Sequence, residues 1–131
     1  MIGLDTNILL RFLLKDDPVQ VAQVRALFRT LTPEQPGWIG ITTILEIVWV
    51  LSGNKALNRE AVALTVSNLL SLDTVVVENS EAVAQALKGF RSGKADFADC
   101  LIAATARVAG CSRIVTFDRI AVRDAGMELL A

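Results

Sequence analysis

Four acidic residues occupy positions from which a parallel sheet would bring their carboxylates together. Asp5 and Asp118 each follow a short apolar run typical of a strand, whereas Glu46 and Asp99 lie early in apolar segments typical of helices. The carboxyl ends of parallel strands and the starts of the helices that follow them lie on one edge of a sheet. We therefore expect these four carboxylates to converge.

Carboxylates crowded together repel one another, so such a cluster is stable only when it is protonated or binds a cation. Ligand sets made only of oxygen favour hard divalent cations, and Mg2+ or Mn2+ is the expected cofactor. A bound cation acidifies water and stabilises negative charge on a phosphate. The chain contains no histidine, which excludes a Ser-His-Asp triad, a Cys-His pair and a histidine zinc site. Metal-dependent phosphodiester hydrolysis is the chemistry that suits this set of residues.

Two of the acids also have structural interpretations. Asp5 could serve only as the cap of the helix that follows it, because short polar residues are common at that position. Glu46 could form a capping box with Thr43, three residues earlier. Its neighbours one helical turn on are Trp49 and Val50, so we expect its face to be turned away from solvent. A lone buried carboxylate would need a partner or a cation there.

Two acids, Asp96 and Asp99, lie at the start of the helical segment that runs from Asp96 to the residues before Gly110. Asp96 is well placed as the N-cap of this helix. Asp99 shares a helical face with small and apolar residues, which predicts that the face packs against a sheet. An acid on a packing face usually has a partner. Asp99 is therefore the stronger candidate for chemistry.

Alternating strand and helix signals predict an α/β fold with a parallel sheet covered on both faces. The expected strands span residues 2–4, 38–41, 74–77, 113–117 and 127–130. The expected helices span 8–15, 17–32, 42–51, 58–70, 80–91, 96–109 and 119–125. No repeat or interdomain linker is visible, so the whole chain, 1–131, is expected to form a single domain.

Composition narrows the class of protein. Hydrophobic residues make up 53% of the 131 residues and charged residues 21%, which is unlike a disordered chain. The net charge of -1 and the pI of about 5.4 are unlike those of a protein that coats nucleic acid, so any such contact must be local or aided by cations. Cys100 and Cys111 are expected to be small core residues. No signal peptide or membrane span is recognisable, and a cytoplasmic location is expected.

The acidic motifs closely resemble those of the PIN domain family, and most of all the VapC toxins of prokaryotic toxin-antitoxin pairs. The resemblance spans residues 1 to about 118 and rests on these segments in this order: Leu4-Asp5-Thr6-Asn7, Glu46 in an apolar helix, Ala95-Asp96-Phe97-Ala98-Asp99-Cys100-Leu101-Ile102-Ala103-Ala104-Thr105-Ala106, and Thr116-Phe117-Asp118. Cys100 departs from the family, which often has alanine there, but the residue remains small.

The resemblance implies a three-layer α/β/α sandwich with a central, mainly parallel five-stranded sheet. It also implies an endoribonuclease that uses Mg2+ or Mn2+, forms a homodimer and is inhibited by a small cognate antitoxin. Asp5 and Asp99 would be the primary metal ligands, and Glu46 and Asp118 would complete the acidic pocket. The accessory groups would be Asp96, Thr6, Asn7 and Thr116.

Other functions remain open from the sequence alone. A phosphoacceptor receiver domain would need two adjacent acids after the first strand and a lysine after the last. A haloacid-dehalogenase-like phosphatase would need a second Asp where Asn7 stands. A PIN fold that binds RNA without cutting it is a third possibility, although it would have no need of the costly acidic quartet. Four basic residues could guide an RNA backbone or be ordinary surface charges: Arg11, Lys15, Arg119 and Arg123.

Overall fold

A parallel three-stranded sheet forms the base of the N-terminal part of the molecule. The structure, a computed structural model, describes residues 1–130 of the chain. Strands β1 (Ile2–Gly3), β2 (Gly37–Ile39) and β3 (Val75–Val77) lie in the order β1-β2-β3. Ile2 is opposite Gly37, and Gly37 is opposite Val75. Since every pair is parallel, helices must carry the chain from one strand to the next.

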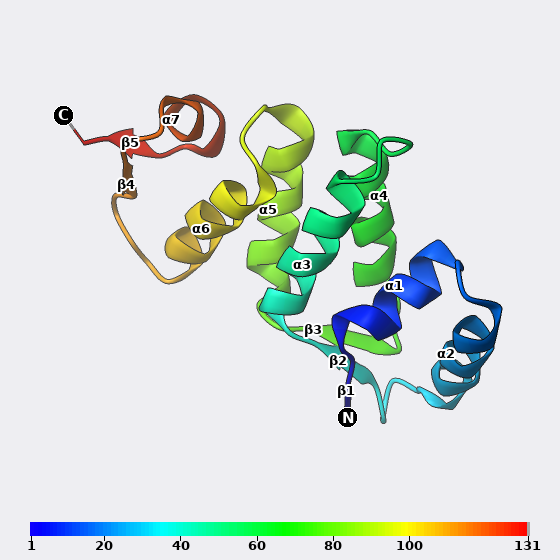
Figure 1. Ribbon diagram of the computed structural model, residues 1–131. Helices are drawn as coiled ribbons and strands as arrows, with labels where there is room; N and C mark the ends of the chain where they lie inside the picture. The colour runs from blue at the N-terminus through cyan, green and yellow to red at the C-terminus, as the bar shows by residue number, and fades with distance from the viewer. Residues whose placement is uncertain (131) are drawn as a thin grey trace.

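Five helices alternate with these strands: α1 (Thr6–Leu14), α2 (Pro18–Thr30), α3 (Ile41–Ser52), α4 (Arg59–Leu70) and α5 (Ser80–Ser92). Their starts follow local capping signals. Asp17 accepts hydrogen bonds from the N–H groups of Val19 and Gln20, and Asn58 accepts one from Ala61. In Figure 1, α1, α3, α4 and α5 lie above the sheet and α2 lies beside it. We call residues 1–92 the N-terminal body.

The core of the N-terminal body is aliphatic. Helix α3 contributes four side chains to it, which explains the long apolar run in the sequence. Burial of side chains of this kind stabilises the fold by roughly 1.5–3 kcal/mol each. The large side chains with the least exposure are Leu9, Ile39, Ile44, Ile47, Val48, Leu51, Val62, Val66, Leu69 and Val83.

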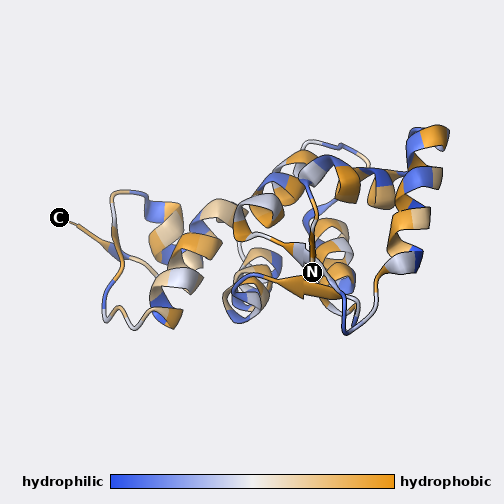
Figure 2. Ribbon diagram, turned by 90° about the horizontal axis from the view of Figure 1, so that it is seen from below, coloured by the Kyte–Doolittle hydropathy of each residue, from blue (hydrophilic) through white to orange (hydrophobic). Residues whose placement is uncertain are grey.

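Helix α6 (Phe97–Val108) packs along α5 and leads to the last three elements. These are β4 (Val115–Thr116), α7 (Arg119–Ala125) and β5 (Glu128–Leu129), which we call the C-terminal unit. Strands β4 and β5 are parallel to each other. Figures 1 and 2 both show this unit at one end of the molecule, remote from β1 and the N-terminus.

The α/β fold class predicted from the sequence is confirmed, as are the five strands and the seven helices expected among residues 1–130. The strands are divided between a three-stranded and a two-stranded sheet. The C-terminal unit is held on the turn between α5 and α6, where the Lys94 N–H donates to Asp124 Oδ2 at 2.9 Å. In this structure β4 pairs with β5 and is not a neighbour of β1.

Two smaller expectations can also be compared with the structure. Cys100 is buried as expected, whereas Cys111 is exposed because it lies beyond the end of α6, so the prediction for Cys111 was wrong. Among residues 1–130, no helix is long and apolar enough to cross a membrane.

Candidate functional site

Asp5 lies directly after β1 and caps α1. Its Oδ1 accepts a hydrogen bond from the Thr6 N–H at 2.8 Å, and the residue is exposed to solvent. The capping interpretation is therefore correct, but it leaves the rest of the carboxylate available. Thr6 is buried, and its Oγ1 has no hydrogen-bond partner. Asn7 is exposed in the first turn of α1. A free hydroxyl oxygen thus lies one residue from an accessible carboxylate.

Glu46 is exposed, and so is Trp49, whose side chain retains 78% of its accessible surface. The expectation that this face of α3 is turned from solvent was wrong. The helix buries Ile44, Ile47 and Leu51 on one side, and its apolar composition conceals an outward face that carries Glu46. Because the Glu46 side chain is exposed to solvent, its carboxylate carries no desolvation penalty in the free protein and is accessible to a ligand.

The capping box between Thr43 and Glu46 is not formed, because α3 begins at Ile41 and Thr43 therefore lies inside the helix rather than at its N-cap. Its N-cap is Gly40, which has no side-chain cap. Instead, Glu78 Oε1 accepts a hydrogen bond from the Ile41 N–H at 2.9 Å. Glu78 follows β3, so it is a further acid at a strand end, and its role was not predicted from the sequence. Its position after the valine run of β3 was the available signal.

Asp96 and Asp99 form the acidic start of α6. Asp96 is the N-cap, as predicted, and its Oδ1 accepts a hydrogen bond from the Asp99 N–H at 2.8 Å. Asp99 is half-buried. Burial raises the pKa of the Asp99 carboxyl above its usual range, and repulsion from Asp96 and Asp118 raises it further. A cation bound here would relieve this repulsion.

The face of α6 that carries Asp99 is only partly a packing face. Ala103 is fully buried, but Ile102 is exposed. Helix α6 packs chiefly on α5 rather than on a sheet, so the predicted close packing against a sheet was wrong. The partial exposure gives a ligand access to the carboxylate of Asp99.

Asp118 lies just after β4 and caps α7. Its Oδ1 accepts hydrogen bonds from the N–H groups of Ile120 and Ala121 at 2.8 and 3.2 Å. The Asp118 N–H in turn donates to Thr116 Oγ1 at 3.0 Å. Thr116 therefore fixes the backbone that presents the acid, which is a positioning role.

The four predicted acids are not all brought together within this chain. The charges that raise the pKa of Asp99 belong to Asp96 and Asp118. In the part of the chain that the structure describes, no three acidic, cysteine or histidine side chains form a group that could hold a metal ion. The predicted convergence is therefore partial, and Asp5 and Glu46 do not complete the group around Asp99.

The model of the PIN domain matches residues 2–126. The chain belongs to the PIN domain family. No curated protein matches it. Among solved structures, the chain is similar to one from the crystal structure of FitAcB from Neisseria gonorrhoeae, with 20% sequence identity and a TM-score of 0.40, over 100% of this chain and 97% of that chain.

A divalent cation is the cofactor that the PIN resemblance implies, and its fit to these residues can be tested. The carboxylates and the unpartnered Thr6 hydroxyl are hard oxygen donors of the right type. The crowding around Asp99 is also what a cation would relieve. Among residues 1–130, however, no three acidic side chains lie in positions that could hold a metal ion together, so the ligand set is only partly assembled in this structure.

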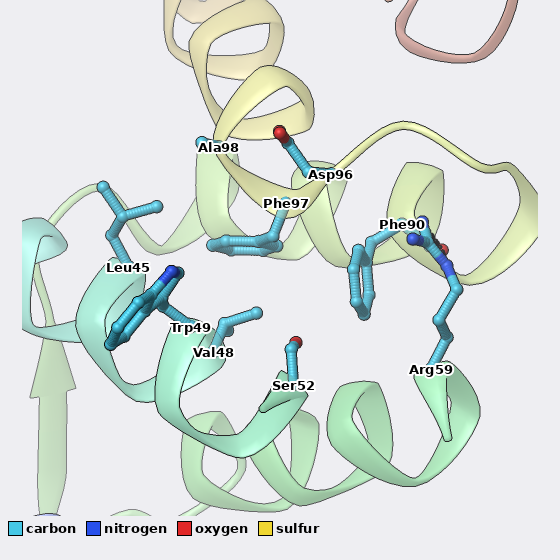
Figure 3. Close-up of a pocket in the computed structure, with 9 residues that line it drawn as sticks. All are labelled: Leu45, Val48, Trp49, Ser52, Arg59, Phe90, Asp96, Phe97 and Ala98. Atoms are coloured by element: carbon cyan, nitrogen blue, oxygen red, sulfur yellow. Dashed lines mark hydrogen bonds between the residues drawn. The ribbon is translucent and has the colours of Figure 1, made fainter. Parts of the chain in front are cut away.

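A cavity of about 350 Å³ lies beside Asp96 in this PIN domain. Trp49, Phe90 and Phe97 line it, and Figure 3 shows the aromatic side chains facing the cavity with Asp96 at its rim. The lining is mainly apolar, which suits an aromatic or aliphatic group. No local sequence pattern indicates this cavity, because its residues come from four different helices.

Arg59, at the start of α4, connects the cavity wall to the acidic helix. Its Nη2 donates to the carbonyl oxygens of Phe90 at 2.7 Å and Ala95 at 2.6 Å, and its Nε donates to Phe90 at 3.0 Å. The guanidinium carbon lies 3.9 Å from the centroid of the Phe90 ring. Arg59 thereby fixes the turn that ends at Asp96.

The four basic residues considered as RNA guides fall into two groups. Arg11 pairs with Asp16 at 3.3 Å, and Arg123 pairs with Asp124 at 3.0 Å. Lys15 and Arg119 are exposed and form no ion pair with any residue from 1 to 130. These two are the more available cations for a phosphate backbone.

Proposed function

We propose that this PIN domain is an endoribonuclease that requires Mg2+ or Mn2+ and is the VapC-type toxin of a toxin-antitoxin pair. The observation that carries the proposal is the placement of three acids near one another, with Asp96 and Asp99 at the start of α6 and Asp118 at the start of α7. Burial, and then repulsion from Asp96 and Asp118, raises the pKa of the Asp99 carboxyl. Such crowding is costly unless a cation or a proton offsets it. The PIN match over nearly the whole chain supports a nuclease in general.

Each acid has a proposed role. Asp5 and Asp99 are the primary ligands of the cation, and Glu46 and Asp118 complete the acidic pocket. Asp96 orients Asp99 by accepting its N–H, as Thr116 orients Asp118. When bound, the cation supplies an acidified water and stabilises charge that develops on the phosphate. Thr6 and Asn7 are the remaining accessory groups.

The expected reaction is hydrolysis of an RNA phosphodiester that leaves 5′-phosphate and 3′-hydroxyl ends. Water supplies the nucleophile, so the ribose 2′-hydroxyl takes no part. The protein has a net charge of -1, and therefore the RNA backbone needs local positive charge. Lys15 and Arg119 can provide it, since both are exposed and form no ion pair within residues 1–130.

Two partners belong to this proposal: a small antitoxin protein and a second copy of the chain. The apolar cavity lined by Trp49 and Phe97 supports the first, because it could take an apolar side chain of a protein partner. The chain acts as a single PIN domain over 1–131 in this proposal, and we place it in the cytoplasm.

A second candidate function is RNA binding without cleavage. One observation favours it, namely that the four acids are not assembled within the described part of one chain. A receiver-like signalling module has less support, because only one acid follows β1 and no lysine follows β4.

The test is cleavage of a mixed RNA pool by purified, antitoxin-free protein, with Mg2+ or Mn2+ and with chelator. We expect cleavage only with the metal, and a loss of about a hundredfold or more in Asp99→Asn, because a charged ligand is replaced by a neutral amide. Asp73→Asn is the control, since Asp73 is an exposed acid outside the site.

The outcomes separate the candidates. Equal activity of Asp99→Asn and the wild type would place the site elsewhere, and products ending in 2′,3′-cyclic phosphate would exclude hydrolysis by water. RNA binding with no cleavage under any condition would favour the non-cleaving function.

A further inference from the structure

Trp49 presents its indole ring to solvent, although it lies on a helix of the aliphatic core. It retains 78% of its accessible surface, whereas its neighbour Val48 retains 2%. Single exposed apolar side chains are common and need no explanation. Trp49 differs from these because it forms one wall of the cavity beside Asp96. The ring is therefore a free aromatic surface at the mouth of a cavity.

The other aromatic walls of this cavity are held in place. Phe90 and Phe97 are 4% and 3% exposed, and their rings pack edge to face with centroids 5.9 Å apart. The guanidinium carbon of Arg59 lies 3.9 Å from the centroid of the Phe90 ring, and its hydrogen bonds to Phe90 and Ala95 fix it there. A ligand therefore meets two rings that lose little conformational freedom when it binds.

The size and shape of the cavity favour a planar group. Figure 3 shows the rings of Trp49, Phe90 and Phe97 around one space, with the Ser52 hydroxyl directed toward it. The volume of about 350 Å³ lies near the lower end of the range of roughly 300–1,000 Å³ for small-molecule sites. Flat rings stack favourably on other flat rings. A heteroaromatic ring system with polar edges is thus the group that suits these walls.

Both sides of the cavity lie next to acids of the candidate site. Ala98 lines the cavity and Asp99 is the next residue of α6. On α3, Trp49 follows Glu46 by three residues. One turn of a helix rises by about 5.4 Å, so each wall is within about one turn of an acid. A nucleic-acid strand with a phosphate at Asp99 therefore has a base within reach of the cavity.

Two lysines near the cavity favour a nucleic acid over a protein side chain as the occupant. Lys55 follows Ser52 by three residues, and Lys94 precedes Asp96 by two. Both lysines are exposed, and neither forms an ion pair with any residue from 1 to 130. The phosphates on either side of a bound base need such cations, particularly in a protein of net charge -1.

We propose that the cavity lined by Trp49, Phe90 and Phe97 binds one unpaired base of the RNA substrate, next to the phosphodiester that is cleaved. This inference rests on the proposed function, which names RNA as the substrate. The base stacks on the indole of Trp49, and the Ser52 hydroxyl donates to or accepts from its polar edge. Stacking tolerates any base but favours the larger purines, so the site prefers an unpaired purine.

Tryptophan fluorescence tests the contact directly. The chain has two tryptophans, so Trp38→Phe leaves Trp49 as the only one, and Asp99→Asn in the same chain prevents cleavage during the measurement. With Mg2+ present, we expect a short oligoadenylate to quench the fluorescence saturably and an oligouridylate to bind more weakly. An abasic ribose-phosphate strand of the same length should bind about tenfold more weakly than oligoadenylate, because it cannot stack. Absence of quenching, or equal affinity for the abasic strand, would overturn the base site.

The kinetics of RNA cleavage give a second readout. Trp49→Ala should raise KM for RNA by about tenfold and leave kcat nearly unchanged, because stacking contributes to binding of the substrate and the transition state alike. Trp49→Phe keeps an aromatic ring and should restore most of the affinity. Leu64→Ala is the matched control, since Leu64 is 49% exposed on α4, outside the cavity. Urea unfolding should be nearly unchanged in Trp49→Ala, because Trp49 is exposed.

The outcomes separate the base site from the proposed function. Quenching by oligoadenylate but not by the abasic strand, with no cleavage under any condition, would support the base site and contradict only the proposed function. Metal-dependent cleavage with an unchanged KM in Trp49→Ala would overturn the base site and leave a protein side chain as the occupant of the cavity.

Discussion

The N-terminal body and the C-terminal unit are stabilised in different ways. The body encloses large aliphatic side chains such as Ile44, Ile47 and Leu51, which are almost fully buried. The unit buries mainly Ala121, Ala125 and Met127, and leaves Phe117 exposed. Small side chains remove little apolar surface from water. A unit with so small a core depends on contacts outside itself, which α7 makes with α5 and α6.

The two regions are joined at the turn between α5 and α6. On the side of the N-terminal body, Arg59 donates three hydrogen bonds to the carbonyl oxygens of Phe90 and Ala95 in this turn. On the side of the C-terminal unit, Asp124 accepts one solvent-exposed hydrogen bond from the Lys94 N–H. The body is thus more firmly connected to the acidic helix α6 than the C-terminal unit is.

The largest expected effect on stability is that of Arg59→Met. This change keeps the apolar stem but removes three hydrogen bonds and the contact with the Phe90 ring. We expect a loss of roughly 2–3 kcal/mol in the free energy of unfolding, measured in urea, because two partly buried carbonyl groups lose their charged donor. The change should also lower RNA cleavage, since it frees the turn that ends at Asp96.

Asp124→Asn provides the comparison for that prediction. It weakens the attachment of the C-terminal unit, and its effect on global unfolding should be clearly smaller. If Asp124→Asn cost as much stability as Arg59→Met, the proposed difference between the two attachments would be incorrect.

A smaller effect is expected from Asp99→Asn on the pH dependence of stability. The pKa of Asp99 is raised in the folded chain, chiefly by burial and then by Asp96 and Asp118. The stability linked to its proton is therefore present below the usual Asp range and is lost as the pH rises through the raised pKa. We expect Asp99→Asn to be more stable than wild type at neutral pH and equal to it in acid.

Thermal melts across this pH range, without divalent ions, would measure the difference. Asp73→Asn should show no such crossover, because Asp73 is an exposed acid outside the site. A variant that is less stable than the wild type at neutral pH would mean that the Asp99 carboxylate is favourably paired rather than crowded.

Local chemistry explains which features could be predicted from the sequence. The helix over 119–125 and the cap at Asp96 depend on neighbouring residues, and both were found. The contact of Glu78 with the start of α3 joins residues 37 positions apart, so no local pattern indicates it. The outward direction of Glu46 was hidden by the apolar composition of α3. The division of five strands between two sheets depends on where the C-terminal unit docks, which is a tertiary property.

The most direct test of the acidic site is to measure the binding of Mn2+ to the full chain by water-proton relaxation and by calorimetry. This measurement does not depend on knowing the RNA substrate. We expect a site that is lost in Asp5→Asn and in Asp99→Asn and kept in Asp73→Asn, because the first two acids bind one cation in the proposed function. Unchanged Mn2+ binding in both Asp5→Asn and Asp99→Asn would contradict it.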